Sequence, residues 1–190
     1  MRLHKPDEKL TSAEEALTLL KEGNARFVSG ELAPKDSHAA DREVLSGGQV
    51  PYAIVLCCAD SRVAPEIYFD QKLGDIFVIR NAGNVVDEVV LGSIEYGAEH
   101  LGSPLVVVLG HTSCGAVTAA VQGGDLPRNI QAIVNKIAPS VGEGEEVNTV
   151  AAKNAKAMAA EIADDEIIKH LGTKVVPAVY NILSGEVEWL

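Results

Sequence analysis

Two short apolar runs, each followed by a motif that contains a thiol, constrain the fold of this chain most strongly. Residues 52–56 read Tyr-Ala-Ile-Val-Leu, and residues 105–109 read Leu-Val-Val-Val-Leu. Short continuous apolar runs are typical of strands that are buried on both faces of a parallel sheet. The motifs at 57–62 and 110–115 therefore lie at the carboxyl ends of two strands. In open α/β sheets, this edge holds the ligand crevice.

The remaining strand patterns complete a sheet. Residues 75–80 and 174–181 read as strands, and a Ser-Gly hairpin turn leads into a short final strand at 186–189. Pro177 moves the fourth strand towards a sheet edge, because proline cannot donate to the ladder. Strands that alternate with helices predict an α/β fold with right-handed crossovers. We expect a central, mostly parallel sheet of about four parallel strands plus a C-terminal antiparallel edge strand, flanked by helices.

The spacing of apolar residues predicts the helices, and glycines mark several of their C-terminal ends. They are predicted at residues 13–30, 89–101, 114–123, 129–138 and 147–170, with an interruption near Ala163 and shorter turns at 39–45 and from Pro65. Ser12 and Glu15 match a capping box for the first helix, which packs either on its own sheet or on a neighbouring subunit. We treat residues 1–48 as an N-terminal helical arm and loop, and residues 49–190 as the α/β core of a single domain.

Composition excludes several function classes. The chain has 190 residues and a formal net charge of −11, which disfavours nucleic acid as a partner. No apolar run approaches the roughly 18 residues of a membrane span, and the N-terminus lacks the apolar region of a signal peptide. Two of the three cysteines are adjacent, which makes a poor disulfide framework but suits metal ligation in a reducing compartment. We therefore expect a cytoplasmic protein without a membrane partner. Neither a dinucleotide-binding nor a P-loop motif occurs.

Two thiols and an imidazole follow the two buried strands. Cys58, His111 and Cys114 form a ligand set that suits Zn²⁺, which takes tetrahedral nitrogen and sulfur sites and keeps an open position for catalysis. Cys57 competes with Cys58, because adjacent strand residues point to opposite faces and only one can face the crevice. We interpret Cys57 as a buried core thiol. A chain that holds no metal is the alternative at this point.

Asp60 and Arg62 form the second part of the first motif. An arginine beside an aspartate keeps the carboxylate ionised and fixes its direction, so the carboxylate can accept a hydrogen bond from a hydroxide on zinc. If the pair breaks, Asp60 can instead fill the fourth zinc position. The simpler alternative is a salt bridge that braces the turn.

The combined pattern resembles the β-class carbonic anhydrases. Cys58 to Arg62 match C-x-D-S-R, and His111 to Gly115 match H-x-x-C-G. The resemblance continues through 77–81 and 94–96, and it is strongest over 49–121. Ala116 departs from a glycine that is common after Cys-Gly in the family, which affects only local packing.

The resemblance implies a zinc-dependent lyase that reversibly hydrates carbon dioxide to bicarbonate and a proton, by attack of a zinc-bound hydroxide that the Asp60–Arg62 pair orients. Gln49 matches the glutamine on the substrate side, and Phe77 and Tyr96 match groups that line the pocket. In the plant-type, non-allosteric branch, which Gln49 and Tyr96 favour, these groups come from across a dimer interface. A homodimer is then the minimum active unit, and a tetramer is an alternative.

Three alternatives stay open. His100, four residues after Tyr96, is either a proton shuttle or a helix-face histidine without a role. The same zinc site would also serve hydrolysis of carbon disulfide or carbonyl sulfide, since the metal ligands would be identical. A non-catalytic zinc-binding protein is the third reading, and the presence of Gln49, Asp60 and Arg62 argues against it.

Overall fold

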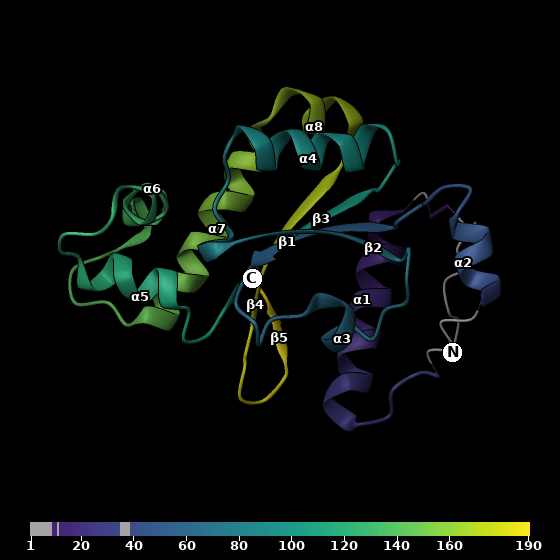
Figure 1. The fold of residues 1–190 in the computed structure, drawn as a ribbon, viewed down its shortest axis with the longest axis horizontal. Coiled ribbons are helices and arrows are strands. Elements are labelled where there is room, and N and C mark those ends of the chain that lie inside the picture. The colour runs from purple at the N-terminus through teal and green to yellow at the C-terminus, as the bar shows by residue number, and fades with distance from the viewer. Residues whose placement is uncertain (1–8, 11, 35–38) are drawn as a thin grey trace.

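A five-stranded sheet organises the part of the chain that the computed structural model describes, which comprises residues 9–10, 12–34 and 39–190 (Figure 1). The strands are β1 (Ala53–Cys58), β2 (Ile76–Asn81), β3 (Leu105–His111), β4 (Lys174–Tyr180) and β5 (Val187–Trp189). Their spatial order is β2-β1-β3-β4-β5, with parallel pairing from β2 to β4 and antiparallel pairing of β5. The predicted fold class is therefore confirmed.

The helices also follow the sequence pattern. They are α1 (Ala13–Ser29), α2 (Ala39–Leu45), α3 (Pro65–Tyr68), α4 (Glu88–Glu99), α5 (Gly115–Gln122), α6 (Arg128–Ile137), α7 (Val147–Asp164) and α8 (Glu166–Leu171), with 3-10 turns η1 (Ala82–Asn84) and η2 (Ala138–Ser140). The predicted interruption separates α7 from α8. Asp165 adopts extended backbone there, and its side chain accepts hydrogen bonds from the N–H groups of Ile167 and Ile168, so it ends one helix and caps the next.

The first helix packs on its own chain. The Ser12 side chain accepts from the N–H of Glu15, and Gly30 ends the helix with a positive φ of 76°. Leu20 is fully buried in a cluster with residues of β1 and β3. Packing on its own sheet is thus the alternative that the structure supports. The loop predicted between α1 and β1 includes residues 35–38, which lie outside the described residues.

Pro177 lies in the last long strand. β4 pairs with β3 along its whole length, including Val108 with Pro177, whereas β5 pairs only with Ala178, Val179 and Tyr180. The proline is accommodated because the antiparallel ladder begins after it. Only the short β5 lies beyond β4, and the Pro177 carbonyl accepts from the N–H of Leu190.

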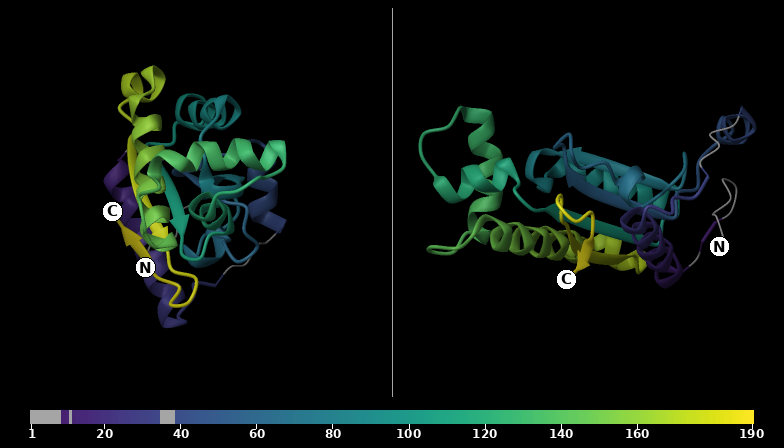
Figure 2. Two further views of the ribbon diagram at one scale, coloured as in Figure 1. Left: turned by 90° about the vertical axis from the view of Figure 1, so that its left-hand side faces the viewer. Right: turned by 90° about the horizontal axis from the view of Figure 1, so that it is seen from below.

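The two faces of the sheet are covered by different helices. Helices α4, α7 and α8 lie on one face, and α1 and α3 lie on the other (Figures 1 and 2). Along β1, Ile54 and Leu56 face the first group, and Val55 faces the second. Helices α5 and α6 extend beyond one end of the sheet (Figure 2). Among the described helices, none has the length and apolar character that a membrane crossing requires.

Candidate metal centre

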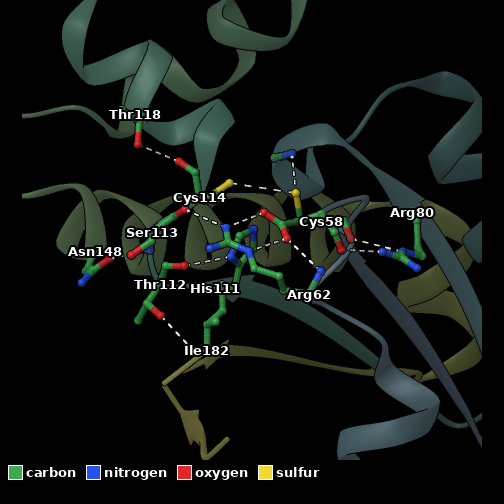
Figure 3. A network of polar contacts seen from close by, with 12 residues as sticks. Cys58, Arg62, Arg80, His111, Thr112, Ser113, Cys114, Thr118, Asn148 and Ile182 are labelled. Atoms are coloured by element: carbon green, nitrogen blue, oxygen red, sulfur yellow. Dashed lines mark hydrogen bonds and ion pairs between the residues drawn. The ribbon is translucent and has the colours of Figure 1, made fainter. Parts of the chain in front are cut away.

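The sheet brings the two sequence motifs together. β1 and β3 are adjacent parallel strands, so their carboxyl ends lie at the same edge. Cys58 is the last residue of β1, His111 is the last of β3, and Cys114 occupies the N-cap position of α5. All three are buried, and their ligand atoms lie within 4.8 Å of one another. Figure 3 shows the three side chains converging, with Arg62 beside them.

The geometry of these three side chains fits a zinc ion. The two sulfurs are 4.0 Å apart, and two sulfurs bound to a tetrahedral zinc would lie roughly 3.8 Å apart. His111 Nδ1 lies 2.9 Å from the carbonyl oxygen of Thr112, which fixes Nδ1 as the donor. The opposite nitrogen, Nε2, is buried and has no hydrogen-bond partner among the described residues. A metal ion would satisfy that atom.

The two adjacent cysteines have different surroundings. Cys58 lies in the cluster under α4 and α7, whereas Cys57 lies on the opposite face with residues of α1 and α3. Burial raises the pKa of Cys57 to about 12, so this thiol stays protonated. Its position agrees with the interpretation of a core thiol.

Hydrogen bonds favour the thiolate form of Cys58. The pKa of Cys58 is lowered, chiefly because the Cys114 thiol donates to it, and the backbone N–H of Gly83 also donates to it at 3.3 Å. The pKa of Cys114 is raised for the same reason, because it holds the proton that the two sulfurs share. Removal of that shared proton would leave two thiolates for a metal, as zinc ligation requires.

Asp60 and Arg62 form a close pair beside the sulfurs. Arg62 donates from Nε to Oδ1 at 2.9 Å and from Nη2 to Oδ2 at 2.7 Å, and its backbone N–H also donates to Oδ1. These bonds hold the pKa of Asp60 far below its usual range. Arg62 Nη2 also lies 3.4 Å from the carbonyl oxygen of Ser113, so the pair connects the two motifs.

Two residues that sequence reasoning did not single out support the same loops. Arg80, at the carboxyl end of β2, donates to the carbonyl oxygens of Cys58 and Asp60 at 3.2 and 2.8 Å. Asn148, on α7, accepts from the N–H of Ser113, which has a positive φ of 56°. A charged residue at the end of an apolar strand was the available signal for Arg80. No signal pointed to Asn148.

The remaining predicted residues lie elsewhere on the chain. Phe77 pairs with Ile54, whereas Cys58 pairs with Asn81, so Phe77 is four residues from the metal end of the sheet, or roughly 13 Å. Tyr96 packs near Phe77 with a centroid distance of 6.3 Å, and His100 packs on Tyr96 at 5.2 Å. These three form an aromatic cluster of α4 and β2. Gln49 borders a surface groove with α2 and Gly74. Within one chain, none of the four belongs to the metal cluster.

Comparison with known proteins agrees with this arrangement. The carbonic anhydrase family model matches residues 53–187. Carbonic anhydrase 2 of Mycobacterium tuberculosis is 51% identical over 135 residues, which cover 69% of this chain and 65% of that protein. The carbonic anhydrase of Mycolicibacterium smegmatis is 51% identical over 126 residues, which cover 64% of this chain and 61% of that protein. The aligned part therefore spans about two thirds or less of each relative.

Solved structures give the same result for the fold. Two tetrameric β-carbonic anhydrases of Sordaria macrospora are described together, and the one compared has a TM-score of 0.73 at 25% identity, with 78% of this chain and 85% of that chain covered. The β-carbonic anhydrase CafA of Aspergillus fumigatus has the same TM-score and identity, with 93% and 89% covered. From the family match, the relatives and the shared fold, this chain belongs to the β-class carbonic anhydrase family.

Proposed function

We propose that this protein reversibly hydrates carbon dioxide to bicarbonate and a proton, with Zn²⁺ as its cofactor. One observation carries the proposal: two buried thiols and a buried imidazole converge beside a carboxylate that an arginine holds ionised. A purely structural zinc site has no need of that carboxylate. The reducing cytoplasm is the proposed location, since the ligand thiols must stay unoxidised there.

Cys58, His111 and Cys114 would hold the zinc. When bound, zinc acts as a Lewis acid that lowers the pKa of water towards about 7. Three protein ligands leave one position of a tetrahedral site for water, which is the pattern of catalytic zinc sites. Because two of the ligands are thiolates, the rest of the site has to contribute more to activating and orienting the attacking water.

Asp60 would orient the attacking water. Both of its oxygens accept from Arg62, and the side chain is 18% exposed at the edge of the cluster. An ionised carboxylate can only accept, so it would bind the remaining O–H of the water and leave a lone pair for carbon dioxide. Arg62 therefore acts through Asp60, as a positioning residue.

A second copy of the chain would complete the substrate pocket. Phe77, Tyr96 and Gln49 lie away from the chain's own metal cluster, and Tyr96 is 48% exposed. In the branch of the family that this chain resembles, such groups come from across a dimer interface, and the Sordaria macrospora relatives are described as tetrameric. We therefore propose a homodimer, or a tetramer built from it, as the active unit. His100, the C-cap residue of α4 with a side chain 63% exposed, would exchange protons with solvent.

Stopped-flow hydration of carbon dioxide tests the proposal directly. We expect rapid hydration by protein that carries one zinc per chain, and loss of the rate after chelation, with recovery when zinc is added back. Bound zinc without hydration would contradict the proposed activity, and carbon disulfide would then be the next substrate to assay. Hydration that persists after complete removal of zinc would contradict the metal mechanism.

A further inference from the structure

A chain of two hydrogen bonds connects helix α7 to the metal cluster. The side chain of Asn154 is fully buried, and its Nδ2 donates to the carbonyl oxygen of Gly83 at 3.0 Å. The backbone N–H of Gly83 in turn donates to the sulfur of Cys58 at 3.3 Å. Asn154 lies 71 residues from Gly83 in the sequence, so this contact exists only in the folded chain.

The backbone of Gly83 needs external support. It has a φ of 78° and a ψ of 13°, a left-handed conformation that side chains disfavour. A Cβ at this position would lie 2.8 Å from Ile137 Cδ1 and 3.1 Å from Ala116 Cβ. Glycine satisfies both restrictions, but glycine is also the residue with the greatest backbone freedom. A bond that fixes the Gly83 carbonyl fixes ψ, and together with φ it sets where the N–H of the same residue points.

The Asn154 side chain is costly to bury. Its Oδ1 is buried and has no hydrogen-bond partner among the described residues. An unsatisfied buried oxygen destabilises the fold, and an apolar residue of similar size would avoid this cost. The other buried α7 positions are apolar, including Ala151, Ala155 and Met158. An asparagine among them makes the Gly83 contact, which an apolar residue could not make.

We propose that Asn154 is a positioning residue, which holds the Gly83 N–H on the Cys58 sulfur and so adjusts how strongly that thiolate donates to the metal. Hydrogen bonds to ligand sulfurs tune metal sites by drawing electron density from the sulfur. In a site with two thiolates, weaker donation leaves the zinc a better Lewis acid. The inference rests on the proposed function, because it assumes that Cys58 ligates the metal.

Cobalt substitution tests the inference without any need for turnover. The energy of the thiolate-to-cobalt charge-transfer band reports how strongly the sulfur donates. In Asn154→Leu we expect this band to move to lower energy than in the parent. A folded Asn154→Leu protein with the parent's band energy would overturn the inference.

Asn24→Leu is the matched control. Asn24 is another buried asparagine, and its Nδ2 donates to the carbonyl oxygens of Tyr68 and Gly185, which are not part of the two hydrogen bonds that connect Asn154 to Cys58. This change should lower Tm and leave the band energy unchanged. An equal band shift in both variants would show that Asn154 acts only through general stability, and would overturn its positioning role.

Two further measurements test the inference in case Asn154→Leu does not fold. Asn154→Ser shortens the side chain, so that it no longer reaches the carbonyl oxygen of Gly83, and it changes the packing less than leucine does. We expect the cobalt band to shift in the same direction as in Asn154→Leu. In the unmodified protein loaded with cadmium-113, scalar coupling should connect the metal to the amide proton of Gly83 through the sulfur. Absence of that coupling would overturn the inference. Absence of hydration with the coupling present would instead count against the proposed reaction.

Discussion

Arg62 donates to both carboxylate oxygens of Asp60, at 2.9 Å from Nε and 2.7 Å from Nη2. Two parallel bonds fix the carboxylate plane as well as its position, which a single bond would not do. The backbone N–H of Arg62 adds a third bond to Oδ1. The pair therefore braces the turn, and this structural role is compatible with the orienting role that we propose for Asp60.

Substitution of Asp60 should separate metal binding from hydration. In Asp60→Asn, the amide cannot accept with both of its polar atoms, so the water would lose its orientation while the three proposed ligands stay intact. We expect unchanged zinc content and a hydration rate roughly 10- to 100-fold lower, measured by stopped flow. Asp125→Asn, at an exposed loop position, is the control. Parental hydration rates in Asp60→Asn would refute the orienting role.

Even the conservative substitution Arg80→Lys should weaken zinc binding. Its guanidinium binds the carbonyl oxygens of Cys58 and Asp60 from two different nitrogens, and a lysine has only one. In Arg80→Lys we expect the loop between these residues to loosen, with about a 10-fold rise in the zinc Kd. Competition with a chromophoric chelator measures this Kd. An unchanged zinc Kd would mean that the loop keeps its conformation without the two guanidinium hydrogen bonds.

Sequence periodicity predicted most of the fold because the residues that begin and end each helix or strand lie close to it in the sequence. The apolar runs of β1 and β3, the glycine stops and the Ser12 cap act within a few residues of the elements they define. The proposed ligands could be found because Cys58 and His111 follow such runs directly. The roles of Gly83, Asn148 and Asn154 could not be found, because their contacts are made across distant parts of the chain and mostly through backbone atoms.

Asn24 should matter for stability because it joins three segments. Its Nδ2 donates to the carbonyl oxygens of Tyr68, the last residue of α3, and of Gly185 in the hairpin, and its Oδ1 accepts from the N–H of Val187. In Asn24→Ala these buried backbone groups lose their partner, so we expect the free energy of unfolding to fall by about 2 kcal/mol. Urea unfolding measures the change. A difference below about 0.5 kcal/mol would show that water replaces the amide.

Hydration should rise from mildly acidic to alkaline pH. The pKa of Asp60 is lowered by Arg62, so the carboxylate stays charged throughout this range and cannot cause the change. Its contribution to stability is present above the ordinary aspartate pKa of about 3.9, and it is lost only as the pH falls further, towards the lowered value. The rise should therefore follow ionisation of the attacking water. A flat stopped-flow profile over this range would contradict that step.

Mixing two inactive variants should restore activity if partner chains share a site. Cys58→Ser removes a proposed metal ligand, and Gln49→Ala removes a proposed substrate contact. In a mixed dimer, one site combines the intact Cys58 of one chain with the intact Gln49 of the other. Random exchange of equal amounts should give about a quarter of the parental hydration rate, because half of the dimers are mixed and each holds one complete site. Subunit exchange verified by mass spectrometry, without recovery of hydration, would place the whole site within one chain.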